Sequence, residues 1–365
     1  MFSDVRKTLD HIIDLGVPGN DFIVYHNGKC IFRETRGYSD HERTKKMCGD
    51  EMVNLYSSSK LITCTSAMKL YEMGKFSLED PLYLYMPEFR EMSIMADGGA
   101  VKAKNYIRVK DLFTMGAGFD YNMSSPEIQK AKAETNGKCP TRKVMEYIAE
   151  RPLCFEPGTK WQYSICHDVL AAFVEVVSGV RFGEFVKKHV FDVAGMEHST
   201  YSFPDEKLPS LMAQYMYKGD EKSYEYIGPK IFNFKIGDEY ESGGAGCISR
   251  TDDYIKFLEA LRTGIILKPE TLALMTKNHL TEEQYKTFAA SQPRLNGYGY
   301  GLGCWCGIGN EGCEDFGWTG AAGTMHSINP KHNLSMFYLQ HVIAGPNREI
   351  WPTLRRHVRM AIEKL

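Results

Sequence analysis

The hydrophobic pattern at the amino-terminal end changes from a helical to a strand-like spacing. Apolar residues recur at helical intervals after Ser3, which predicts a helix with Ser3 as its N-cap and Gly16 at its end. Two short apolar segments follow, at residues 22–26 and 30–34, and they flank an Asn-Gly pair at 27–28. Asn-Gly is the dipeptide most typical of a two-residue hairpin turn. We therefore expect a helix followed by a β-hairpin.

The centre of the chain has a helical pattern. Apolar positions between Ser57 and Gly74 share one helical face, and residues 168–178 form a second apolar segment that Gly179 ends. The last third returns to strands, which we predict at 300–306, 323–328 and 334–342, before an amphipathic helix at 350–365.

Strands at both ends and helices between them predict one sheet built from both termini. The expected fold class is α+β, an α/β sandwich with an antiparallel sheet flanked by helices. Residues 1–55 and 246–365 would form the sheet region, and residues 56–245 would form a mostly helical region covering one side.

Composition narrows the functional class only slightly. The chain has 365 residues, 43% of them hydrophobic and 25% charged, with a formal net charge of −2. These values are typical of a globular protein and indicate no attraction to nucleic acid or to an anionic membrane. The first fifteen residues lack the apolar core of a signal peptide, and the ten cysteines are scattered. We expect reduced thiols and a cytoplasmic location. Nothing in the sequence indicates an oligomeric state.

The candidate nucleophile is Ser57, which stands three residues before Lys60. On a helix this spacing puts both side chains on one face, so the lysine can reach the serine hydroxyl. At a helix start the amide of Ser57 would also be free to donate to an oxyanion. The pair Ser66 and Lys69 has the same spacing, but its serine would lie in mid-helix with its amide already bonded.

Two further segments strengthen this assignment. Tyr163 follows the turn-forming stretch 156–159, and a tyrosine beside a lysine ammonium can act as a general base. The small residues of 316–324 let an acyl group approach the backbone.

Other catalytic and binding motifs are absent or better explained by structure. The chain contains neither Gly-x-Ser-x-Gly nor His-Glu-x-x-His. Cys304 and Cys306, with Cys313 nearby, are interpreted as inward-facing thiols, and the glycines of 297–303 as strand-edge residues. His167 is expected near the site but outside it. The sequence therefore predicts no metal and no cofactor.

The whole chain from about residue 22 resembles the serine β-lactamase-like hydrolases, which share the fold of the penicillin-binding proteins. Within this group it is similar to class C β-lactamases and family VIII carboxylesterases. The resemblance rests on ordered segments along the chain: 56–61, 71–81, 85–89, 109–119, 155–158 with 163–164, 195–200, 242–246 and 318–320. It implies the β-lactamase/transpeptidase-like fold and one catalytic domain with its active site between the two regions.

The resemblance also implies a role for each matching residue. Ser57 would be acylated, Lys60 would assist its deprotonation, and Tyr163 would carry the proton to the leaving group and then activate water. The backbone amides of Ser57 and Ala321 would form the oxyanion hole. How Lys60 and Tyr163 divide the work of the base stays open.

Two departures from the β-lactamase pattern bear on the substrate. Ile165 stands in place of an asparagine that would bind a β-lactam side-chain amide, and Trp318 stands in place of a lysine that would attract a carboxylate. We therefore predict a pocket formed by Trp318, Thr319, Gly320 and Ile165 and a small-molecule ester or amide substrate. Esters with small or apolar acyl groups are favoured, with weak or no β-lactamase activity.

Four alternatives remain open at this stage. The same apparatus could serve a D-amino-acid peptidase or transpeptidase, a β-lactamase or an acyltransferase, and the fold could belong to a catalytically silent binding protein. The natural substrate is not readable, although the aromatic-rich region 201–240 is expected to contribute to its pocket. The aromatic side chains in question are Tyr215, Tyr217, Tyr224, Tyr226, Phe232 and Phe234.

Overall fold

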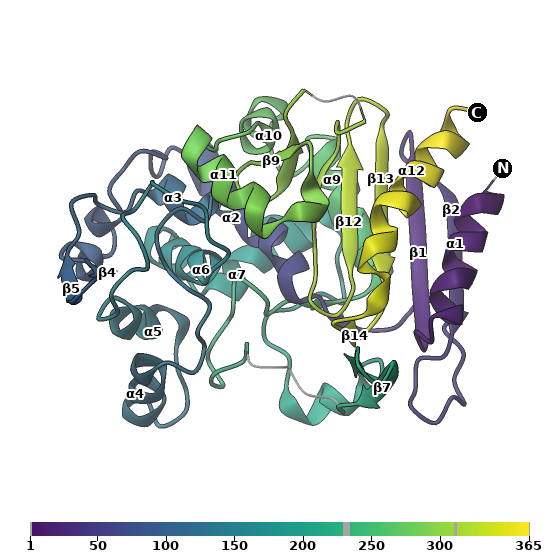
Figure 1. Ribbon diagram of the computed structural model, residues 1–365, viewed down its shortest axis with the longest axis horizontal. Coiled ribbons are helices and arrows are strands. Elements are labelled where there is room, and N and C mark those ends of the chain that lie inside the picture. Colours follow the sequence, from purple (N-terminus) through teal and green to yellow (C-terminus); the bar gives the residue numbers. More distant parts are fainter. Residues whose placement is uncertain (1, 229–233, 310–311, 365) are drawn as a thin grey trace.

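Figure 1 shows the computed structural model, which describes residues 2–228, 234–309 and 312–364. The α-helices in these ranges are α1 (Ser3–Asp14), α2 (Ser59–Glu72), α3 (Val109–Phe113), α4 (Pro126–Glu134), α5 (Thr141–Ile148), α6 (Cys166–Ser178), α7 (Phe182–Val186), α8 (Asp192–Ala194), α9 (Thr251–Arg262), α10 (Pro269–Thr276), α11 (Glu282–Ser291) and α12 (Trp351–Ile362).

The strands form one large sheet and three small ones. They are β1 (Gly19–His26), β2 (Lys29–Gly37), β3 (Val53–Asn54), β4 (Ser93–Ala96), β5 (Gly99–Lys102), β6 (Tyr215–Lys218), β7 (Ser223–Tyr226), β8 (Ile248–Ser249), β9 (Tyr298–Tyr300), β10 (Trp305–Gly307), β11 (Phe316–Thr319), β12 (Met325–Asn329), β13 (Leu334–Leu339) and β14 (Val342–Ile343).

The large sheet joins the two ends of the chain. Its strand order is β2-β1-β13-β12-β11-β10-β9, and every neighbouring pair is antiparallel. The amino-terminal hairpin thus pairs with the last long strand, where Phe22 lies opposite Tyr338. This arrangement confirms the predicted α+β fold and the sheet built from both termini. The predicted hairpin turn is also present, with Asn27 at φ 51° and Gly28 at φ 75°.

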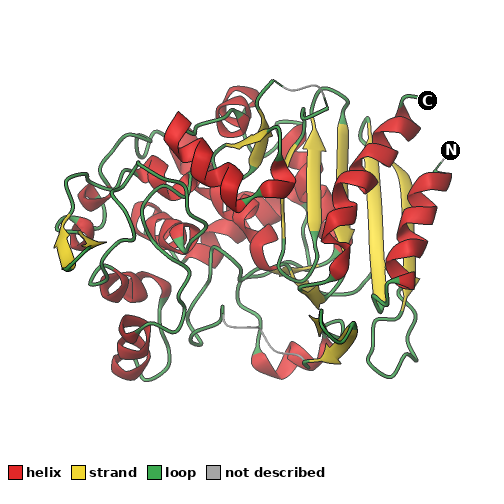
Figure 2. Ribbon diagram, viewed as in Figure 1, coloured by secondary structure: helices red, strands yellow, loops and turns green. Residues whose placement is uncertain are grey.

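Helices cover the sheet on both faces. Helices α1 and α12 lie side by side across one face, and α9 packs on β1 and β13 from behind (Figure 1). Figure 2 shows that the part of the molecule away from the sheet is mostly helical. There α2 packs against α6, and nearly all its side chains are buried. The central position of α2 places its first turn near the end of β11.

Several predicted elements have different limits. The segment 300–306 is two strands, because the chain turns back between Tyr300 and Trp305, where Gly301 N–H donates to the carbonyl of Cys304. Gly303 occupies φ 95° in this turn, a conformation that favours glycine. Cys304 is therefore in a turn rather than on a strand, although it is buried as expected.

The other two corrections concern the carboxyl-terminal end and the first helix. Segment 334–342 leaves the large sheet after Leu339, and β14 pairs with β6 instead. The last helix, α12, begins at Trp351 after a 3-10 turn. Ser3 is the first residue of α1 and makes no N-cap bond, since the cap position belongs to Phe2. In each case tertiary packing sets the boundary.

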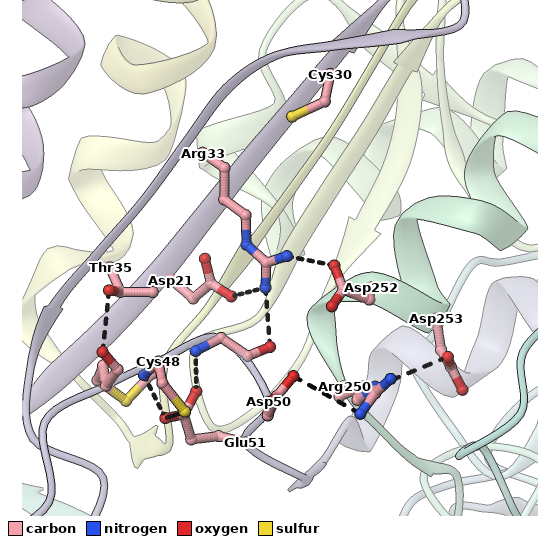
Figure 3. Close-up of polar contacts among 12 residues, drawn as sticks. Asp21, Cys30, Arg33, Thr35, Cys48, Asp50, Glu51, Arg250, Asp252 and Asp253 are labelled. Atoms are coloured by element: carbon pink, nitrogen blue, oxygen red, sulfur yellow. Dashed lines mark hydrogen bonds and ion pairs between the residues drawn. The ribbon is translucent and has the colours of Figure 1, made fainter.

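An arginine links the outer strands to α9. Arg33 on β2 donates 3.1 Å to the buried carboxylate of Asp21 on β1, 2.8 Å to the carbonyl of Gly49, and also to Asp252 of α9 (Figure 3). Burial raises the pKa of Asp21, and the charge of Arg33 opposes that shift. The guanidinium therefore supplies an opposite charge to a buried carboxylate.

We expect acid to destabilise the fold through His326, which is fully buried on β12. Burial lowers its pKa from 6.5 to about 3. Below pH 6.5 the unfolded chain takes up a proton that the folded chain does not. Stability is therefore lost as pH falls through this window, by up to about 1.4 kcal/mol per pH unit.

Urea unfolding of the wild type and of His326→Gln at several pH values between about 7.5 and 4.5 measures this contribution. The variant should show the shallower loss of stability on acidification. His11→Gln, which changes an exposed histidine, serves as the control. Equal slopes for the wild type and His326→Gln would contradict the assignment.

Candidate active site

Ser57 lies at the amino-terminal entrance to the central helix α2. A 3-10 turn (Tyr56–Ser58) precedes α2, and Tyr56 adopts φ 47°, which is uncommon for a bulky residue. The side chain of Ser57 is 9% exposed, whereas Lys60 one turn later is fully buried. The predicted helix start at Ser57 is thus a tight turn that leads into the α-helix. This turn fixes the serine hydroxyl at the edge of the buried core.

The three predicted catalytic side chains lie together. The ammonium nitrogen of Lys60 is 3.4 Å from Ser57 Oγ, and the hydroxyls of Tyr163 and Ser57 form a hydrogen bond of 2.5 Å. Lys60 Nζ also lies 4.6 Å from the centre of the Tyr163 ring. Either hydroxyl can donate in the Tyr163–Ser57 pair. The serine proton can therefore pass to Tyr163 without any movement of the backbone.

Lys60 has three acceptors for its three N–H donors. It donates 2.7 Å to the carbonyl of Gly244 and 3.3 Å to the hydroxyl of Tyr121, in addition to its contact with Ser57. An ammonium group offers three donors and no acceptor. The surroundings of Lys60 therefore suit its protonated form.

Aromatic rings enclose Tyr163. It stacks on Tyr121 at 5.5 Å between ring centres and on Trp318 at 5.9 Å, with interplanar angles of 16° and 17°. Trp318 on β11 is 5% exposed and contacts Tyr300 and Trp305 edge-on or tilted. The stack fixes the orientation of the phenol and excludes water from its faces.

The turn between β11 and β12 docks against the start of α2. Thr324 Oγ1 is 2.8 Å from Ser58 Oγ and donates 3.3 Å to the carbonyl of Leu55. Ala321, in the same turn, packs against the buried cluster of Tyr56, Ala322 and Ile343. The contacts of Thr324 tie the turn that carries Ala321 to the segment that carries Ser57, as the predicted oxyanion hole requires.

A cavity of about 130 Å³ adjoins the segment 318–320. Trp318 and Thr319 line it together with apolar side chains from β10, β12 and α12. Two cations, Arg294 and Arg355, also line it, and sequence reasoning missed them because they lie far from Trp318 along the chain. Both are engaged in ion pairs, Arg294 with Glu349 and Arg355 with Asp315.

Ile165 and His167 are both buried in the core. Ile165 is 2% exposed in the hydrophobic core, so its side chain offers little surface to a substrate. Gly320, the last of the predicted pocket residues, is buried in the β11–β12 turn. His167 is fully buried against the carbonyl of Phe113, and burial lowers its pKa to about 3. It is a neutral core histidine.

Sequence reasoning also missed Tyr121 and Asp168. Asp168 is fully buried on α6, and Ser242 and Tyr240 donate to its Oδ1 at 2.6 and 3.0 Å. Burial raises its pKa, while these hydrogen bonds and the charge of Lys60 oppose the shift. The visible signal was an acidic residue in the first turn of a largely apolar helix.

The aromatic region 201–240 contributes to the site only in part. Phe234 contacts the rings of Tyr56 and Tyr121 at 5.7 and 5.6 Å. Four of the predicted tyrosines form β6 and β7 instead. Phe232 lies outside the described residues.

Among residues 2–228, 234–309 and 312–364, no three histidine, cysteine or acidic side chains gather closely enough to hold a metal ion. Within the same ranges, no helix has both the length and the apolar character needed to cross a membrane.

Comparisons with known proteins place this geometry in a family. Protein Rv1367c of Mycobacterium tuberculosis is 26% identical over 360 residues, covering 92% of this chain and 88% of its own. Esterase EstB of Burkholderia gladioli is 27% identical over 272 residues, covering 69% and 67%.

The structure of EstCE1, a hydrolase with promiscuous acyltransferase activity, superposes with a TM-score of 0.78 at 24% identity, covering 98% of this chain and 99% of its own. The family model described as Beta-lactamase matches residues 5–358. The chain therefore belongs to the beta-lactamase family.

Proposed function

We propose that the protein is a serine hydrolase that works through an acyl-enzyme, with Ser57 as its nucleophile. The observation that carries this proposal is the position of the Ser57 hydroxyl, which lies 2.5 Å from the hydroxyl of Tyr163 and 3.4 Å from Lys60 Nζ. A serine hydroxyl is a weak nucleophile and needs such a partner to remove its proton.

The reaction follows from these contacts. Tyr163, as a phenolate stabilised by the Lys60 ammonium, takes the proton of Ser57 while Oγ attacks the ester carbonyl. The amides of Ser57 and Ala321 stabilise the oxyanion. When the carbon–oxygen bond to the leaving alcohol breaks, Tyr163 returns the proton to that alcohol. It then takes a proton from water while the water oxygen attacks the acyl-enzyme, and it gives that proton to Ser57 Oγ as the bond between Oγ and the acyl carbon breaks and the acid leaves.

Esters with small or apolar acyl groups are the substrates we favour. Trp318 stands where a β-lactamase has a lysine, so an aromatic side chain takes the place of a cation. The adjoining cavity of about 130 Å³ is small, and apolar side chains line it together with polar residues that include two arginines. Its two arginines already have carboxylate partners, so they attract a substrate carboxylate less than a free lysine would. The name of the relative EstB, an esterase, supports the same choice over a β-lactamase or a D-amino-acid peptidase.

Acyl transfer to an alcohol is the second candidate. Only 9% of Ser57 is exposed, and the rings around Tyr163 limit the access of water. An acyl-enzyme that reacts slowly with water can be captured by an alcohol. The dual activity of EstCE1 supports this possibility.

Replacement of Ser57 by alanine should lower kcat/KM for p-nitrophenyl butyrate by about 10³-fold or more, because the nucleophile is lost. Ser66→Ala is the matched control. Ser66 has the same spacing to a lysine but bonds only to the carbonyl of Ile62 in mid-helix. Nitrocefin turnover by the wild type should be weak in comparison. Equal losses in the two variants, or nitrocefin turnover matching ester turnover, would overturn the proposal.

Tyr163→Phe should lower kcat by about 10²- to 10⁴-fold, because the ring remains stacked while the proton acceptor is lost. Binding of the substrate should change little, since the apolar wall is kept. Steady-state kinetics with p-nitrophenyl acetate measure both quantities. A variant with wild-type kcat would remove Tyr163 from the reaction.

Added alcohols should divert the acyl group. With p-nitrophenyl butyrate and increasing 1-butanol, we expect butyl butyrate to form at the expense of free butyrate, as measured by gas chromatography. Ser57→Ala should form none above the background. Formation of free butyrate alone would exclude the acyltransferase candidate and leave the hydrolase.

A further inference from the structure

The ammonium group of Lys60 is fully buried, so other groups must offset the free-energy cost of removing its charge from water. Moving an ammonium group out of water costs several kcal/mol unless an opposite charge or hydrogen bonds replace the hydration. Its three acceptors, on Ser57, Tyr121 and Gly244, are uncharged when their hydroxyls are protonated. Any negative charge that balances the ammonium therefore comes from a group other than these three acceptors.

The ionisable groups around Lys60 come from helices α2 and α6 and from the loops that carry Tyr121 and Tyr163, and most of them are neutral at neutral pH. Burial raises the pKa of Cys166 to about 12 and lowers that of His167 to about 3. Burial also raises the pKa of Cys64 and of Tyr121 well above their usual values. Apart from Tyr163 itself, these groups bring no negative charge to the ammonium.

Asp168 is the carboxyl group in this set. It lies on α6, and its charge interacts with that of Lys60. A β-carbon added at Gly244 would lie 2.5 Å from Asp168 Oδ2 and 3.3 Å from Lys60 Nζ. The two charged groups therefore lie within about 6 Å of each other, where opposite charges favour each other's ionised form.

The contacts of Asp168 also suit a carboxylate. Ser242 and Tyr240 both donate to Oδ1, and Oδ2 is buried without a side-chain donor among the described residues. The charge of Asp168 also acts on two titratable phenols, Tyr121 and Tyr240, and contributes to raising the pKa of each. This arrangement explains the Ser-Gly-Gly-Ala-Gly segment at 242–246. Its serine binds Asp168, and its second glycine lets the backbone pass between Asp168 and Lys60.

We propose that Asp168 is a positioning residue, which keeps Lys60 in its ammonium form and directed at Ser57 and Tyr163 by balancing its buried charge. This inference rests on the proposed function of Ser57, Lys60 and Tyr163 and names the group that sets the protonation state of that site. Lys60 thereby supports the Tyr163 phenolate and leaves the removal of the serine proton to Tyr163.

The variant that tests this is Asp168→Asn, which keeps the shape of the side chain and removes its charge. Without the carboxylate, the Lys60 ammonium should lose its proton at lower pH. The alkaline limb of the kcat/KM profile should therefore move down by about one pH unit or more. Asp253→Asn is the matched control, because Asp253 is equally buried but accepts hydrogen bonds from His198 N–H and Ser199 Oγ. Figure 3 shows its ion pair with Arg250. Asp253→Asn should leave the profile unchanged even if it lowers stability.

A titration without substrate separates this inference from the proposed function. In protein labelled with ¹³Cε-lysine, the Lys60 resonance is identified by its absence in Lys60→Arg. It should be that of a charged amine at neutral pH and should titrate at lower pH in Asp168→Asn. A neutral Lys60 in the wild type, or the same titration in both proteins, would overturn the role of Asp168 whether or not esters are hydrolysed.

If Asp168→Asn does not fold, the reciprocal measurement decides. In full-length protein labelled with ¹³Cγ-aspartate, Lys60→Met should raise the pH at which one buried carboxyl group titrates, because coupling between two sites is mutual. The absence of any such carboxyl group would overturn the proposal.

Discussion

The buried ammonium of Lys60 is the constraint around which the helical part of the molecule is arranged. A charge in this position is tolerated only when polar groups surround it closely. The chain supplies them from separate segments: Ser57 from the turn before α2, Tyr121 from the loop after α3, and the carbonyl of Gly244 from the segment before β8. The packing that holds these three segments in place therefore also sets the geometry of the site.

The aromatic stack connects that charge to the sheet. Tyr121 comes from the helical part and Trp318 from β11, and Tyr163 lies between them. Because stacked rings resist tilting, the phenol hydroxyl stays aimed at Ser57 while the two parts of the fold are held together. A single row of three rings thus serves both to join the parts and to align the reacting groups.

The sequence predicted the features that depend on neighbouring residues. It did not predict the features that depend on contacts between residues far apart in the chain. The spacing of Ser57 and Lys60 and the hairpin at Asn27 are short-range signals, and the structure contains both features. Whether Ile165 faces a substrate or the core depends on how α6 packs, which no short motif encodes. The same holds for Asp168, whose proximity to Lys60 depends on the packing of α6 against α2 and on the intervening backbone of Gly244.

The pairing of β1 with β13 affects how the chain folds during its synthesis. The ribosome makes β1 first, yet the strand that pairs with it along its free side is completed more than 300 residues later, at Leu334–Leu339. Until β13 is made, one edge of β1 has no strand to pair with. An unpaired edge of this kind favours aggregation of the incomplete chain. The turn that carries Ala321 is also made late. A nascent chain therefore holds Ser57, Lys60 and Tyr163 well before it holds the turn that carries Ala321.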